Sequence, residues 1–145
     1  MDRAPHRPPG AVLVWASLLV VPVAFGLVVG TVRDPAAADA RFAPLFFWIA
    51  LAASAFDLVL AWILPHRIGP PRAAPETVAL TRLLVAWALC EAAAIFPLVA
   101  YMITGDARLP WVSAAGLVAL ASLFPGERRW RAALPGPAEP ARMVR

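Results

Sequence analysis

The sequence contains no lysine, one cysteine and two histidines, and charged residues make up only 15% of its 145 residues. Because Cys90 is alone, the chain forms no internal disulfide. His6 and His66 lie outside the apolar segments, so neither an HExxH zinc motif nor a histidine pair for haem is present. No glycine-rich phosphate loop or Ser-His-Asp set appears either. These absences predict a protein that is not an enzyme and has no metal or cofactor.

The composition is unusually apolar. Hydrophobic residues make up 61% of the chain, whereas about 45–50% is usual in soluble domains. One water-soluble core of this size cannot bury so much apolar surface. The net charge of +4 comes from arginines in short segments between apolar runs, without the basic helix typical of nucleic-acid binding. We therefore expect a membrane protein whose surroundings are the lipid bilayer, with no nucleic-acid partner.

Four apolar segments approach the roughly 20 residues that a helix needs to cross a bilayer core. They span residues 11–32, 43–64, 78–104 and 109–124. Pro35, Pro65 and Pro125 follow three of them and are expected to end the helices. The sequence predicts an all-α integral membrane protein, an antiparallel bundle of four transmembrane helices in one domain over residues 1–126. A basic, proline-rich cytoplasmic tail follows over residues 127–145.

Arginine is divided unevenly between the two sides of this bundle. Three arginines lie on one side, namely Arg33, Arg41 and Arg108. The other ten accompany the two termini and the loop at residues 65–77, and they are Arg3, Arg7, Arg67, Arg72, Arg82, Arg128, Arg129, Arg131, Arg142 and Arg145. Arginine is enriched on the cytoplasmic side. Both termini are therefore predicted to be cytoplasmic in the cell inner membrane, with Arg128, Arg129, Trp130 and Arg131 as anchors at the membrane interface.

A cleaved signal peptide is the competing interpretation of the N-terminus. The stretch Ala38-Asp39-Ala40 has the small residues of a cleavage site. The apolar run before it is about 22 residues long, however, beyond the roughly 7–15 of a signal-peptide apolar region. We therefore expect the first segment to remain as a span.

Two acidic residues, Asp57 and Glu91, lie inside the apolar segments. A charge at the bilayer centre costs roughly 2.5–3.5 kcal/mol even on a lenient scale, so such residues face protein or water. Small residues, which mark helix-packing faces, recur at helical spacing around both. The stripe with Asp57 contains Ala50, Ala53, Ser54 and Ala61. The stripe beside Glu91 contains Ala86, Cys90, Ala93, Pro97 and Ala100.

Antiparallel pairing would place Asp57 and Glu91 within roughly 5 Å in depth, close enough to share a proton, a water or a small cation. Pro97 removes a backbone donor and leaves the carbonyl of Ala93 free beside Glu91. Glu91 and Asp57 are therefore the candidate proton- or cation-binding residues, supported by Pro97, Ala93 and Ser54. The alternative is structural: each acid is protonated and bonded to a neighbouring helix.

Gly26 and Gly30 match the small-xxx-small pattern of helix dimers. Packing within the bundle is the favoured interpretation, and dimerisation through this face is the alternative.

The stretch ALCEAAAIFPLVA at residues 88–100, preceded by Arg72-Ala-Ala-Pro75-Glu76, resembles the second half of a rotary ATP synthase proteolipid (c) subunit hairpin. The resemblance rests on Glu91, Ala92, Ile95 and Phe96, and it implies that Glu91 carries an ion. The family's glycine repeat has only a faint counterpart in Ala50, Ala52 and Ser54, and two extra helices flank the hairpin.

Residues 89–105, with FPGERRW after the last segment, also resemble a family of small bacterial four-span membrane proteins to which no activity is assigned. The preferred function is a small subunit or scaffold of a larger membrane complex, with other membrane subunits or further copies of the chain as partners. The alternative is proteolipid-like proton or cation binding and translocation through Glu91. A small-molecule or lipid transporter formed by an oligomer ranks last.

Overall fold

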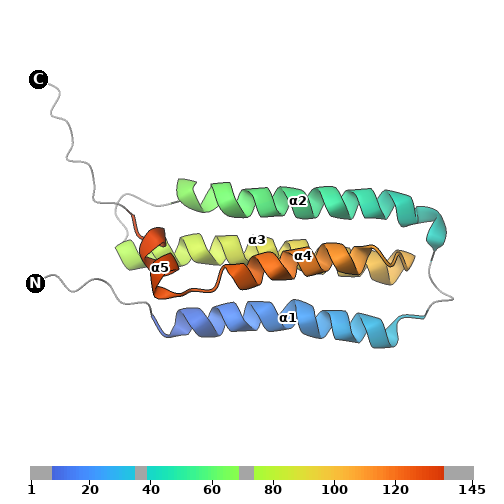
Figure 1. The fold of residues 1–145 in the computed structure, drawn as a ribbon, viewed down its shortest axis with the longest axis horizontal. Helices are drawn as coiled ribbons and strands as arrows, with labels where there is room; N and C mark the ends of the chain where they lie inside the picture. The colour runs from blue at the N-terminus through green and yellow to red at the C-terminus, as the bar shows by residue number, and fades with distance from the viewer. Residues whose placement is uncertain (1–7, 35–38, 69–73, 136–145) are drawn as a thin grey trace, which may run out of the picture.

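The computed structural model describes residues 8–34, 39–68 and 74–135, and these residues are helical apart from short connections and contain no strand. The elements are α1 (Gly10–Val32), the 3-10 turn η2 (Ala40–Phe42), α2 (Ala43–Arg67), α3 (Pro75–Thr104), α4 (Leu109–Ser122) and α5 (Glu127–Ala133). Figure 1 shows the four longer helices side by side, running alternately in opposite directions. The predicted all-helical fold is confirmed.

Some residues used in the sequence analysis lie outside the described ranges. They are Pro35, which is expected to end the first span, and Ala38 of the possible cleavage site. Five of the counted arginines also lie outside: Arg3, Arg7, Arg72, Arg142 and Arg145.

Three helical stretches are long and apolar enough to cross a membrane: Gly10–Val32, Ala40–Arg67 and Pro75–Thr104. The fourth predicted span differs from them. Helix α4 has only 14 residues, about 21 Å at 1.5 Å per residue. It qualifies only together with α5, and the two helices are bent by 88° relative to each other. Among the residues that the structure describes, there are therefore three candidate spans, or four if α4 and α5 form one broken span.

Prolines begin the helices as expected but do not always end them. Pro44, Pro75 and Pro110 occupy the first turns of α2, α3 and α4, where a missing N–H costs no helical hydrogen bond. Gly105 ends α3 in the left-handed conformation, at φ 74°, which glycine adopts without steric penalty. The expectation that Pro65 ends the second span is wrong, because α2 continues to Arg67.

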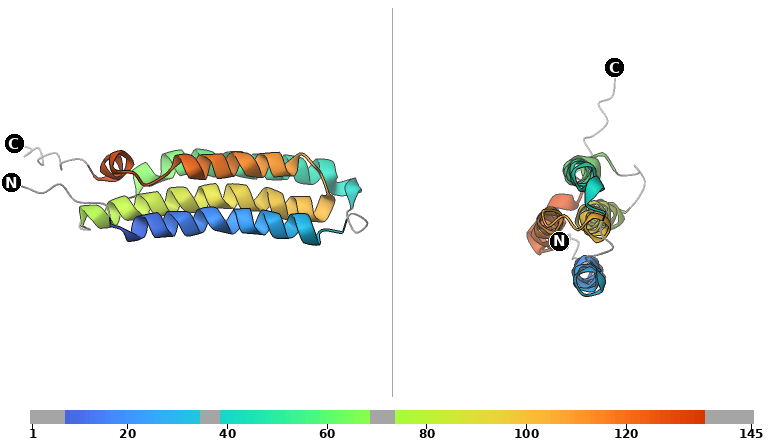
Figure 2. Two further views of the ribbon diagram at one scale, coloured as in Figure 1. Left: turned by 60° about the horizontal axis from the view of Figure 1, so that its bottom comes forward. Right: turned by 90° about the vertical axis from the view of Figure 1, so that its right-hand side faces the viewer.

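Helix α3 is the centre of the bundle. In its apolar 18-residue stretch, 50% of the residues are buried inside the protein. The corresponding share is 11% in α1 and 17% in the stretch Ala40–Arg67 that contains α2. It packs against α1, α2, α4 and α5. In the end-on view of Figure 2, α1 and α2 lie on opposite sides of the pair formed by α3 and α4. Side chains on different faces of α3 therefore meet different neighbours.

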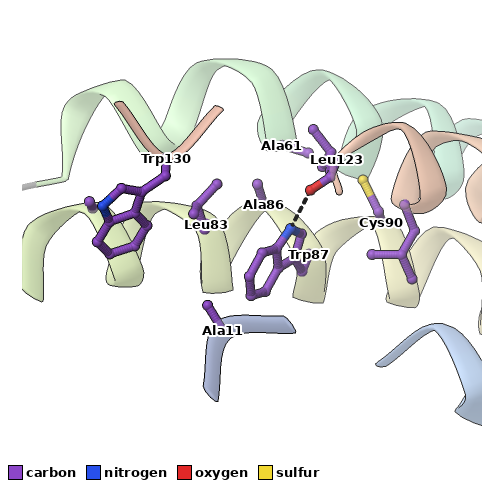
Figure 3. Close-up of a cluster of buried hydrophobic side chains, with 10 residues drawn as sticks. Ala11, Ala61, Leu83, Ala86, Trp87, Cys90, Leu123 and Trp130 are labelled. Carbon is purple, nitrogen blue, oxygen red and sulfur yellow. Dashed lines mark hydrogen bonds between the residues drawn. The ribbon is translucent and has the colours of Figure 1, made fainter. Parts of the chain in front are cut away.

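Two tryptophan side chains donate hydrogen bonds to carbonyls at the C-terminal end of α4. The indole Nε1 of Trp15 donates to the carbonyl of Leu120, and that of Trp87 donates to the carbonyl of Leu123, both at 3.0 Å. The carbonyl of Leu120 also accepts from the backbone N–H of Leu123 at 3.1 Å. The carbonyl of Leu123 lies beyond the last turn of α4, where a helix offers no intrahelical donor, and in a bilayer such a group must be satisfied within the protein. Figure 3 shows the bond from Trp87 in the buried cluster, whose labelled members include Ala11. Helices α1 and α3 thus hold the turn that follows α4.

The segment predicted as a tail begins with α5, a short helix held against the bundle. Its Trp130 is fully buried and belongs to the same cluster as Leu83 and Trp87. Arg82 of α3 reinforces the attachment, because its Nε donates to the carbonyl of Ile68 and its Nη1 to the carbonyl of Ala133, both at 3.0 Å. Trp130 is therefore a core residue and contributes no surface to a membrane interface, contrary to its predicted role as an anchor.

Candidate functional site

The predicted small-residue stripes form the contact between α2 and α3. On α3, all five members are buried: Ala86, Cys90, Ala93, Pro97 and Ala100. On α2, Ala50, Ser54 and Ala61 are buried, whereas Ala53 is half-buried. Small side chains let the two helix backbones approach closely. This contact positions the candidate residues around Ser54 and Ala93.

Ser54 occupies the backbone acceptor that Pro97 leaves open. Proline at position 97 has no N–H for the carbonyl of Ala93, and the hydroxyl of Ser54 donates to that carbonyl at 3.0 Å, in a buried position. From the sequence, this carbonyl is expected to be free beside Glu91. The expectation is wrong, because the Ser54 hydroxyl of α2 is hydrogen-bonded to this carbonyl.

Asp57 continues the α2 stripe one turn beyond Ser54. Since Ser54 lies opposite Ala93 in an antiparallel pair, Asp57 lies about level with Cys90, three residues earlier in α3. Its side chain is half-buried. Within the described residues, it makes no hydrogen bond or ion pair.

Glu91 lies at a similar depth but on another side of α3. It shares a helix face with Trp87 and Leu98, four residues before and seven after it. Leu98 lies 3.5 Å from where a Cβ on Gly26 of α1 would be, and the ring of Trp87 points toward Ala11 of α1 (Figure 3). Glu91 therefore borders α1.

The structure does not bring the two carboxylates together. Asp57 lies on α2 and Glu91 on the α1 side of α3, and α1 and α2 are on opposite sides of the bundle (Figure 2). Glu91 directly follows Cys90 of the stripe, and this step of one residue rotates the side chain by about 100° around the helix. Like Asp57, Glu91 is half-buried and has no hydrogen bond or ion pair among the described residues.

Of the two glycines of the small-xxx-small pattern, Gly26 and Gly30, only Gly26 faces a neighbouring helix. Gly30 is exposed, and a Cβ there would meet nothing within 4 Å. Among the described glycines, the closest contact is in α4 and is not among the predicted packing residues. A Cβ on Gly116 would lie 2.7 Å from the backbone N of Ala94 and 2.9 Å from the carbonyl carbon of Ala93. The small pair Ser113 and Gly116, three residues apart, is the sequence signal that could have predicted this contact.

The polar groups do not assemble a metal centre. No group of three or more histidine, cysteine or acidic residues that could hold a metal ion occurs in residues 8–34, 39–68 and 74–135. The carbonyl of Ala93 is occupied by Ser54, and the two carboxylates are separated. What the geometry offers chemically is an isolated protonatable carboxyl group on each of two helix faces.

Two arginines are paired with nearby aspartates at the end of the bundle formed by η2 and the loop after α3. Arg41 bonds Asp39 at 2.9 Å, and Arg108 bonds Asp106 at 2.6 Å. The hydrogen bond from the guanidinium lowers the pKa of each carboxyl group, Asp39 beside Arg41 and Asp106 beside Arg108. Arg33 donates from Nη1 to the hydroxyl of Tyr101 at 3.1 Å.

The opposite end, around α5, carries arginines without such partners. Arg128 is exposed and Arg129 is half-buried, and neither forms an ion pair with a described residue. Arg131 makes only a 3.8 Å contact with Glu127. The three predicted arginine anchors therefore lie at the surface, unlike Trp130.

Comparisons of the chain with protein-family models, curated proteins and solved structures find no match.

Proposed function

We propose that this chain is a non-enzymatic, multi-pass protein of the inner membrane that acts as a small subunit or scaffold of a larger membrane assembly. The observation that carries the proposal is Glu91, a half-buried carboxyl group in the middle of α3 with no partner among the described residues. An acid at this depth faces protein or a wet cavity in nearly all membrane proteins. A neighbouring subunit would supply that protein surface.

The surface beside Glu91 suits a helix from another subunit. Ala88 and Ala92 lie next to Glu91 on α3, and both are exposed. Small exposed residues allow close approach of a second helix, and a polar side chain among them provides a hydrogen bond across the contact. The partner is either another membrane protein or a second copy of the chain.

The proposed orientation places the α5 end in the cytoplasm. Among the described residues, this end carries Arg67, Arg82, Arg128, Arg129 and Arg131 but only two acids, Glu76 and Glu127. The other end carries three arginines, Arg33, Arg41 and Arg108. The arginine excess favours the cytoplasmic side for the α5 end. In this arrangement α4 and α5 together form the fourth, broken span.

Photo-crosslinking tests the subunit proposal. Benzoylphenylalanine at position 92 of the full chain, irradiated in native membranes, should give one discrete adduct of defined mass. Val118 is 69% exposed on α4, away from Glu91, and serves as the matched control that should give none. Glu91→Gln keeps a hydrogen-bonding group and should preserve the adduct, whereas Glu91→Leu should weaken it. Only unmodified monomer at position 92 would contradict the proposal.

Proton binding at Glu91 is the second candidate function, favoured by the same unpartnered carboxyl group. A protonated mid-membrane carboxyl reacts with hydrophobic carbodiimides, so labelling should occur at Glu91 and disappear in Glu91→Gln. Asp57→Asn, which removes the other half-buried acid, is the matched control and should leave Glu91 labelling intact. Absence of labelling between pH 6 and 8 would reject this candidate. Cation binding has less support, because Ser54 occupies the carbonyl of Ala93.

A further inference from the structure

A cavity of about 550 Å³ opens at the α5 end of the bundle. It lies where α2 ends, α3 begins, and α4 turns into α5. Its apolar wall comes from α2, α3 and the end of α4, with Ala61, Leu83, Ala86, Leu123 and Phe124. Its polar lining is basic and consists of His66, Arg82, Arg128 and Arg129.

Among the described residues, no acidic side chain compensates the charge of this cavity. Its lining, as far as residues 8–34, 39–68 and 74–135 provide it, contains no aspartate or glutamate. None of its three arginines forms an ion pair with these residues. At the opposite end of the bundle, by contrast, Arg41 and Arg108 are paired with their own aspartates. Arginines held close together without a counter-ion favour binding of an anion, and guanidinium groups suit phosphate in particular.

The cavity is built on fixed elements. Arg82 is positioned by its bonds to the carbonyls of Ile68 and Ala133. Helix α5, which carries Arg128 and Arg129, is held by the buried Trp130. The turn before α5 is held by the bond from Trp87 to Leu123. Since the Arg82 side chain and the backbone of α5 are positioned before a ligand arrives, less conformational entropy is lost on binding.

We propose that this cavity binds the phosphate headgroup of an anionic phospholipid, with the arginines contacting the phosphate and an acyl chain lying along the apolar wall. Charge complementarity selects the anion, and the apolar wall beside the arginines selects an amphiphile over a free anion. The position at the end of the candidate spans is the depth of lipid headgroups. This site goes beyond the proposed subunit role and does not depend on it.

The test uses the full chain in a neutral detergent, with bound lipid counted by native mass spectrometry. Short-chain phosphatidylglycerol should bind with a stoichiometry of one, and phosphatidylcholine at least about tenfold more weakly. Arg129→Gln should weaken phosphatidylglycerol binding about five- to tenfold, because one arginine near a phosphate contributes about that factor. Arg131→Gln removes the same charge from the same helix outside the cavity and should change binding less than twofold.

A second variant tests the cavity without changing charge. Ala132 lines the cavity and is exposed, so Ala132→Trp should fill the space, leave the fold intact by circular dichroism and reduce phosphatidylglycerol binding. Equal losses in Arg129→Gln and Arg131→Gln would overturn the proposal in favour of general surface attraction. Unchanged binding in Ala132→Trp would overturn the cavity as the site. Inorganic phosphate that binds alone at micromolar concentration would overturn the assignment to a lipid.

Discussion

The hydroxyl of Ser54 donates a 3.0 Å hydrogen bond to the carbonyl of Ala93, four residues before Pro97. A proline in α3 and a serine in α2 therefore act as a pair: the proline removes a helical donor and the serine replaces it. The bond joins the two helices at the middle of their contact and fixes their register.

This pairing predicts that Ser54→Ala lowers the free energy of unfolding by about 1 kcal/mol. The loss should shrink when Pro97→Ala is also present, because alanine restores the backbone N–H that bonds Ala93 within α3. SDS titration of the four proteins in mixed micelles measures the coupling. Equal losses in both backgrounds would show that the serine and the proline are independent.

The close contact at Gly116 predicts a steric penalty. Gly116→Ala places a methyl group 2.7–2.9 Å from the backbone of Ala94 and Ala93, so α4 must move away from α3, at a cost of about 1–3 kcal/mol. Gly30→Ala is the matched control, because nothing lies within 4 Å of its Cβ position. Thermal unfolding of both variants should show a lower Tm for the first only.

The indole caps predict that Trp87→Phe destabilises the protein beyond the loss of ring size. The substitution leaves the carbonyl of Leu123 without its side-chain donor, which costs about 1–3 kcal/mol for a buried acceptor. Trp62 is 67% exposed, and Trp62→Phe provides the control. Similar unfolding free energies for the two variants would contradict a capping role.

The pair Asp106–Arg108 predicts a pH-dependent contribution to stability. Because Arg108 lowers the pKa of Asp106 in the folded state, the ionised carboxyl stabilises the fold at pH values above its unfolded pKa of about 3.9. That contribution disappears as the pH falls through the lower folded pKa. Asp106→Asn should therefore be less stable than the native chain at pH 7, with the difference closing as the pH falls below the unfolded pKa of about 3.9. A difference that is constant over this range would contradict the ion-pair explanation.

The helices could be predicted from the sequence because long apolar runs and prolines determine them locally. The predicted ranges 11–32 and 78–104 differ from α1 and α3 by no more than three residues at either end. The end of α2 was misplaced because Pro65 was treated as a stop, although a proline near the end of a helix disrupts few hydrogen bonds. Helix α5 was missed because seven residues are too few for a periodic pattern, and its attachment depends on the distant residues Trp87 and Arg82.

The site was predicted in part for a related reason. Helical spacing correctly grouped Ser54 with Ala50 and Ala61 on one face, and burial of the stripe beside Cys90 follows the same pattern. Spacing does not tell which neighbouring helix each face meets. Glu91 is therefore expected from the sequence beside the α2 seam and near Asp57, whereas in the structure it borders α1. The partner of the Ala93 carbonyl was missed because it depends on the register between helices, which no local pattern contains.

Because α4 is short, the bundle is longer along its axis on the α3 side than on the α4 side. Helix α3 has 30 residues and α4 has 14, about 45 Å and about 21 Å along their axes. A bilayer that matches α3 is too thick for α4, and such a hydrophobic mismatch is relieved by local thinning or by a neighbouring protein. The bend of 88° into α5 lays a basic helix across the shortened side. The bundle would therefore distort a bilayer on that side only, and lipids or subunits of matching thickness would gather there.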